Sequence, residues 1–175
     1  MFYTDDDMKI YEGEPAPPEK TPGEESAQQY VVHRENGNLE KTRQMGELLA
    51  QTLVGDSSRL AGDPCYRQKL VLLSFLVSDE LEAGLTDGIL LKSAAAAFRN
   101  KVEELDPEIF AVITDSTAFT LYILHDRKVG DDQCGKVLAE LCERDGDEDL
   151  IREGNTLAEE YRALFSGIIQ SYTFK

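Results

Sequence analysis

The sequence predicts an all-α protein, arranged as an irregular bundle or orthogonal array of about six helices. Apolar residues recur at spacings of three and four along most of the chain beyond Glu24, as they do in helices that bury one face. Signals that start helices, in which an Asp precedes the first turn, fall at several of the expected boundaries. With 175 residues, 41% of them hydrophobic, the chain is long enough to bury a core of its own.

The first 25 residues are expected to form an acidic, Pro-rich tail (residues 1–25) ahead of a single helical domain at 26–175. Four of the six prolines lie within residues 12–25, where they favour extended and solvated backbone. The apolar residues among the first eleven could still dock the tail onto the body. After the tail, a short helix is expected to end at the turn signal Asn36-Gly37-Asn38, and the next helix spans about 39–54.

The most hydrophobic helix is expected at 65–83, after the start signal Asp63-Pro64. Its middle, LVLLSFLV, is apolar on all sides, which is typical of a helix at the centre of a core. Thr86 or Asp87 can cap the following helix. Four consecutive alanines at 94–97 in that helix favour helix formation and suit a close contact with another helix.

The segment 109–124 contains sequence signals for both helix and strand. Its β-branched and aromatic residues could form a hairpin of two strands around Asp115-Ser116, which would make the fold α+β. A continuous helical stripe runs through the same residues, and Asp106-Pro107-Glu108 before them is a helix start signal. We therefore expect one helix here and keep the hairpin as the alternative.

Two further helices are expected in the last third of the chain. The first spans 131–144, and Asp147 can cap a long final helix with acids in its first turn. The final helix carries a strong apolar stripe over 150–172. We expect this stripe to pack into the core, and its alternative role is an interface for a protein partner or a homodimer.

The net charge of −16 is concentrated in two regions. Residues 1–30 contain eight acids against two lysines, and residues 131–160 contain eleven acids against three basic residues. This surface disfavours nucleic acid and anionic membranes, since both are bound through clustered Lys and Arg. No apolar run reaches the length of a membrane span, no signal peptide is recognisable, and three cysteines show no disulfide pattern, so we expect a cytoplasmic protein.

No cofactor or metal is expected from the motifs. The glycine-rich loops that bind phosphates are absent from the sequence. The acids from Asp145 onward resemble the opening of a calcium loop, but Leu150 and Thr156 occupy the positions that need Gly and Glu. Cys134 and Cys142 lie two helical turns apart, which is too far to share one zinc ion.

A weak candidate site is formed by Asp115, Tyr122 and His125. The chain has only two histidines, so acid–base chemistry would fall mainly to carboxylates. Asp115 lies in an apolar segment, and buried carboxyl groups with shifted pKa values often mark sites. These residues could belong to a small helical enzyme or metal-binding protein, or simply form a solvated stripe on a surface helix.

Because catalytic signatures are missing, the leading hypothesis is a helical protein that serves in protein–protein interaction or regulation. The acidic Pro-rich tail and the long amphipathic final helix favour this hypothesis. The alternatives are the enzyme or metal protein around Asp115 and an acidic mimic of DNA. For the last, the acids of 131–160 would have to stand in for phosphates.

Overall fold

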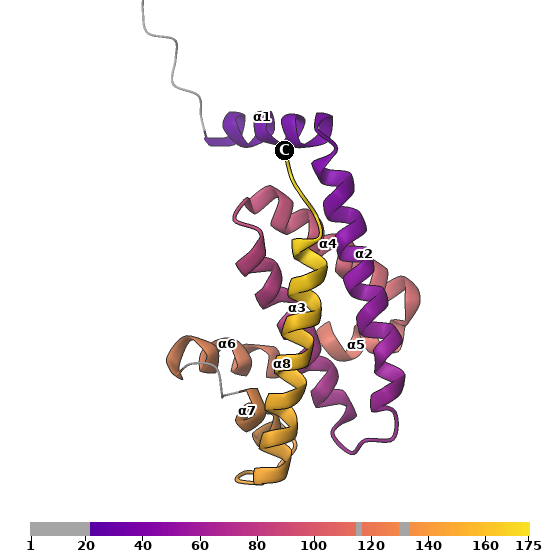
Figure 1. The fold of residues 1–175 in the computed structure, drawn as a ribbon, viewed down its shortest axis with the longest axis vertical. Coiled ribbons are helices and arrows are strands. Elements are labelled where there is room, and N and C mark those ends of the chain that lie inside the picture. Colours follow the sequence, from indigo (N-terminus) through magenta and orange to yellow (C-terminus); the bar gives the residue numbers. More distant parts are fainter. Residues whose placement is uncertain (1–21, 115–116, 130–133) are drawn as a thin grey trace, which may run out of the picture.

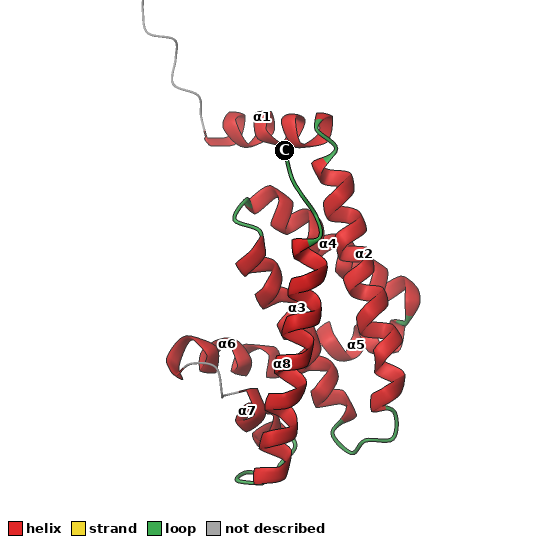
Figure 2. Ribbon diagram, in the orientation of Figure 1, coloured by secondary structure: helices red, strands yellow, loops and turns green. Residues whose placement is uncertain are grey.

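The computed structural model describes residues 22–114, 117–129 and 134–175, without the side chains of Pro22 and of residues 125–129. These residues form eight α-helices and one short 3-10 helix, with no strand among them (Figures 1 and 2). The all-α prediction is confirmed, with somewhat more helices than the six expected. The elements are α1 (Pro22–Glu35), α2 (Asn38–Ser57), η1 (Ser58–Leu60), α3 (Tyr66–Gly84), α4 (Gly88–Leu105), α5 (Pro107–Thr114), α6 (Ala118–Val129), α7 (Cys134–Leu141) and α8 (Glu148–Gln170).

Helix α3 lies at the centre of the core, as its sequence predicts. Every residue of Leu70–Val77 is buried. In Figure 1, α8 runs alongside α3, and α7 packs on the same helix α8. A helix that is apolar all round needs neighbours on every side, and α3 contacts α2, α4, α5, α6, α7 and α8.

The helix start signals work through local hydrogen bonds. Asp87, Asp106 and Asp147 each accept hydrogen bonds from two backbone N–H groups in the first turn of the helix that follows. Four N–H groups at a helix N-terminus lack partners within the helix, so such a carboxylate stabilises the start. The expected caps of α4, α5 and α8 are confirmed.

The described residues 109–114 and 118–124 are helical, so the hairpin alternative is wrong. The expected single helix is corrected too, because α5 ends at Thr114 and α6 begins at Ala118. The break allows both short helices to contact α3, with Ile109 and Ile113 buried from α5 and Tyr122 from α6. One straight helix would carry its later residues away from α3.

Helix α7 is shorter than the expected span 131–144. It ends at Leu141 because Glu143 adopts a left-handed φ of 55° and the Arg144 N–H donates to the carbonyl of Ala139. This is the hydrogen-bond pattern of a helix terminus that reverses direction. Residues 131–133 lie outside the described part of the chain.

Helices α2 and α4 approach closely at Gly46. A Cβ built on Gly46 would lie 2.8 Å from the Phe98 nitrogen and 2.9 Å from Ala97 Cβ, and it would overlap the Ala94 carbonyl oxygen. Of the alanines at 94–97, Ala94 and Ala97 form the close helix contact that their size predicts. This contact fixes how α2 and α4 lie side by side.

The expected tail falls almost entirely outside the described residues. Its last four residues, 22–25, form the first turn of α1. Across the described helices, no single one is long and apolar enough to cross a membrane, although the bent pair α5 and α6 would meet the criteria of length and composition together.

Candidate functional site

The predicted candidates Asp115, Tyr122 and His125 are only partly described. Asp115 and the side chain of His125 lie outside the described residues, so their grouping stays a prediction. Tyr122 is 1% exposed, and its ring stacks on Phe75 with centroids 5.2 Å apart. Its hydroxyl has no hydrogen-bond partner in the described structure, and burial raises its pKa far above the ordinary value. This environment favours packing over proton transfer at Tyr122.

A buried ion pair network forms around Lys69, which is 1% exposed. Its ammonium lies 2.6 Å from Asp63 and 2.5 Å from Glu153, so α8 is tied to the start of α3. Burial alone would lower the pKa of Lys69, but the two carboxylates raise it above its ordinary value. Lys69 therefore remains charged and paired, which makes it a structural cation and not a catalytic base.

A second polar network joins α1, α2, α4 and the C-terminal segment. His33 Nε2 lies 3.0 Å from Asp87, and Asn38 donates to His33 Nδ1 at 3.1 Å. Buried Asn38 also exchanges hydrogen bonds with the backbone of Lys175, whose end lies beside α1 in Figure 1. Both ring nitrogens of His33 are occupied, so this group holds elements together and leaves no free nitrogen for a substrate.

The cysteines have the character of packed thiols. Burial, followed by the neighbouring Cys65 thiol, raises the pKa of Cys142 to about 12. A thiol with such a pKa is almost fully protonated at neutral pH and is a poor nucleophile. Cys134 is buried in the core, and no group of three or more potential metal ligands exists in the described residues.

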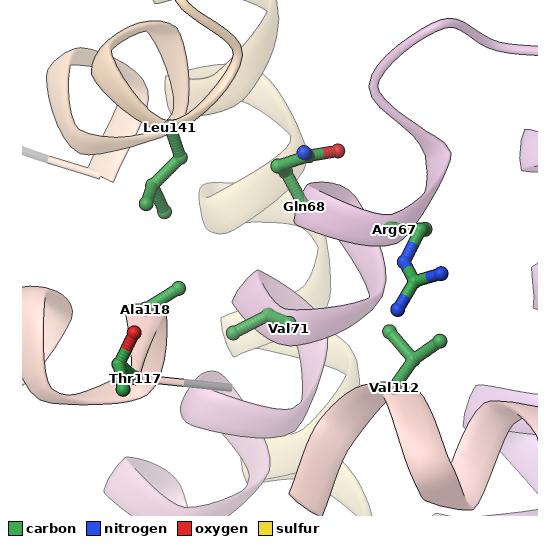
Figure 3. A pocket seen from close by; sticks show the side chains of 7 residues that line it. All are labelled: Arg67, Gln68, Val71, Val112, Thr117, Ala118 and Leu141. Carbon is green, nitrogen blue, oxygen red and sulfur yellow. The ribbon is translucent and has the colours of Figure 1, made fainter. Parts of the chain in front are cut away.

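Three hollows lined by described residues are candidate binding sites. The smallest lies between α3, α5, α6 and α7 and has a volume of about 210 Å³. Figure 3 shows Arg67 reaching toward Val112, with Leu141 and Ala118 across the hollow from Val71. This volume is below the range of about 300–1,000 Å³ typical of ligand pockets.

The largest of these three is a groove of about 940 Å³ between α1, α2 and α4, hereafter the α1 groove. In Figure 1, α1 lies across the end of α2. Apolar side chains form much of the lining: Ala27, Tyr30, Leu39, Ile89, Ala96 and Ala97. Its charged lining residues are Arg34, Arg43 and Lys92 against the single carboxylate of Glu40.

A third hollow of about 440 Å³ lies between α3, α4, α5 and α6. Its walls combine apolar side chains with hydroxyl groups and one arginine, Arg99. Thr114 and Thr120, on either side of the break between α5 and α6, both line it. Its volume lies within the range typical of small-molecule pockets.

Comparison of the chain with protein-family models, curated proteins and solved structures gave no match. Function must therefore be argued from the geometry of the chain itself.

Sequence reasoning did not find the α1 groove or the 440 Å³ cavity. One available signal was Tyr30-Val31-Val32, three consecutive apolar residues that cannot all face one core from a helix. No comparable signal marks the cavity, because its walls come from four helices that periodicity alone does not place together.

Proposed function

We propose that this protein is a non-enzymatic helical interaction module that binds an acidic amphipathic helix of a partner in the α1 groove. One observation carries the proposal: an apolar floor and a cationic rim occur together in one open groove, on a chain with a net charge of −16. A helix with an apolar face flanked by acids complements both features.

Helix α1 supports this proposal because it buries little of its own surface. None of its described side chains is fully buried, and Tyr30 and Val32 are 50% and 51% exposed. A helix of 14 residues is only marginally stable alone in water, and Val is a poor helix former. A partner that packs along α1 at Tyr30 would bury apolar surface and stabilise the helix.

The charges of the rim select the partner's chemistry. Arg43 is already paired with Glu40 at 2.6 Å and Glu47 at 3.0 Å. Arg34 and Lys92 have no ion-pair partner among the described residues. At physiological ionic strength charges beyond about 8 Å are largely screened, so a partner bound near Arg34 and Lys92 interacts mainly with these cations and less with the acids of residues 131–160.

The final helix is less suited to the same role. The expected interface at 150–172 has its apolar stripe in the core, where Leu150, Tyr161 and Phe165 are buried. Leu164 is the large apolar residue of α8 that remains exposed, at 41%. A partner or homodimer through α8 stays a prediction, and α1 exposes more large apolar residues, namely Tyr30, Val31 and Val32.

A helical-peptide display selection against the full chain tests the proposal. We expect the selected peptides to carry an apolar stripe flanked by Asp or Glu, and to shift amide NMR signals of the α1 groove. Lys92→Glu should weaken their binding at least about tenfold. The matched control Lys136→Glu, at an exposed lysine of α7, should leave binding unchanged.

Failure to select any peptide would overturn the proposal. So would selected peptides without acidic residues, or peptides whose affinity does not respond to Lys92→Glu. Circular dichroism of each variant separates loss of binding from loss of folding.

A further inference from the structure

The 440 Å³ cavity between α3, α4, α5 and α6 has the composition of a small-molecule site. Its apolar walls are formed by Leu81, Ala95, Phe98, Ile113 and Phe119. Two of these walls are phenylalanine rings, from α4 and α6, which favour a flat aromatic body between them. The volume lies within the range of pockets that enclose small organic ligands.

A serine of α3 contributes a hydroxyl group to the lining of this cavity. Ser74 is 6% exposed, lines the cavity, and its hydroxyl makes no hydrogen bond with any described residue. The neighbouring hydroxyls of Ser78 and Thr114 differ, since they donate to the carbonyls of Ser74 and Phe110. The Ser74 hydroxyl is not fully shielded from solvent, so it is available to exchange a hydrogen bond with a polar atom of a ligand.

An arginine lies at the exposed side of the same cavity. Arg99 is exposed, lines the cavity and has no ion-pair partner among the described residues, although the chain has nearly twice as many acids as basic residues. A guanidinium group binds a carboxylate through two parallel hydrogen bonds. The cavity therefore has a cationic group at its exposed side, apolar walls and a serine hydroxyl in its lining.

We propose that this cavity binds a small hydroxyaryl carboxylate. The carboxylate pairs with Arg99, the ring lies between Phe98 and Phe119, and the ligand's hydroxyl exchanges a hydrogen bond with Ser74. This site is separate from the α1 groove, because it is lined by α3, α5 and α6 in addition to the opposite flank of α4. The two proposals can fail independently.

The experiment titrates the full chain with three probes and measures affinity by calorimetry and amide NMR shifts. The probes are para-hydroxyphenylpropionate, phenylpropionate, which lacks the hydroxyl, and para-propylphenol, which lacks the carboxylate. We expect the first to bind with a Kd of about 1 mM or tighter, to shift signals of residues lining the cavity and to bind more tightly than the other two.

Variants of Arg99 and Ser74 test which residue contacts each end of the ligand. Arg99→Gln should weaken the binding of para-hydroxyphenylpropionate at least about tenfold and leave the affinity for para-propylphenol unchanged. Ser74→Ala should weaken the binding of para-hydroxyphenylpropionate about fivefold and leave the affinity for phenylpropionate unchanged. Ala95→Leu fills the cavity and should weaken all three probes, while Arg67→Gln, a matched exposed arginine on α3, should weaken none.

The proposal is overturned by an absence of binding to all three probes in wild-type protein that circular dichroism shows to be folded. It is equally overturned if para-hydroxyphenylpropionate binds with the same affinity to Arg99→Gln and Ser74→Ala. Signal shifts confined to residues outside the cavity would also reject it.

Discussion

Replacing Gly46 by Ala tests the close contact of α2 and α4, on which the α1 groove depends. An alanine Cβ at this position would lie within 3.0 Å of the Phe98 nitrogen and Ala97 Cβ and would overlap the Ala94 carbonyl. Two of these three obstacles are backbone atoms, so no side chain can rotate away. The helices must separate, and the contacts along them weaken.

The expected change in the free energy of unfolding is the sum of two opposing contributions. Ala is a better helix former than Gly by about 1 kcal/mol. Overpacking of a tight contact costs about 3 kcal/mol. The Gly46→Ala variant should therefore lose about 2 kcal/mol of its free energy of unfolding.

Gly55 supplies a matched control in the same helix. A Cβ at Gly55 meets nothing within 4 Å, so Gly55→Ala should gain about 0.5–1 kcal/mol from helix propensity alone. Urea unfolding followed by far-UV circular dichroism should separate the midpoints of the two variants by about 1–2 M. A Gly46→Ala midpoint equal to or above that of the wild type would refute the tight α2–α4 contact.

Three further outcomes follow from the buried polar groups. Burial raises the pKa of Asp63, but Lys69 and the Cys65 N–H hold it below its ordinary value. The ionised Asp63 therefore stabilises the fold above its unfolded pKa of about 4, and this stabilisation is lost as the pH falls. In urea titrations at a series of pH values, the free energy of unfolding of Asp63→Asn should decrease less at acidic pH than that of the wild type. Tyr122→Phe removes an unpartnered buried hydroxyl and should raise the melting temperature by about 2–4 °C, and a lower one would contradict this assignment. Cys142, with a pKa raised to about 12, should react with iodoacetamide far more slowly in the folded protein than in urea.

The local features of this fold were largely predictable. Asp87, Asp106 and Asp147 cap helices through backbone groups two or three residues ahead, so the sequence contains both partners of each hydrogen bond. The apolar run of α3 likewise required a central position whatever its neighbours. The split of 109–124 was not predictable, because its helical stripe is continuous and only packing against α3 favours a break.

The sequence by itself determined that this chain is helical, where most helices begin and which one is central. Tertiary structure alone decided the polar networks and the hollows, since Lys69 pairs with Glu153 from 84 residues away and His33 with Asp87 from 54. Helical periodicity defines which side chains share a face, but it does not say which faces meet. The α1 groove and the Ser74–Arg99 cavity exist because particular faces of distant helices come together.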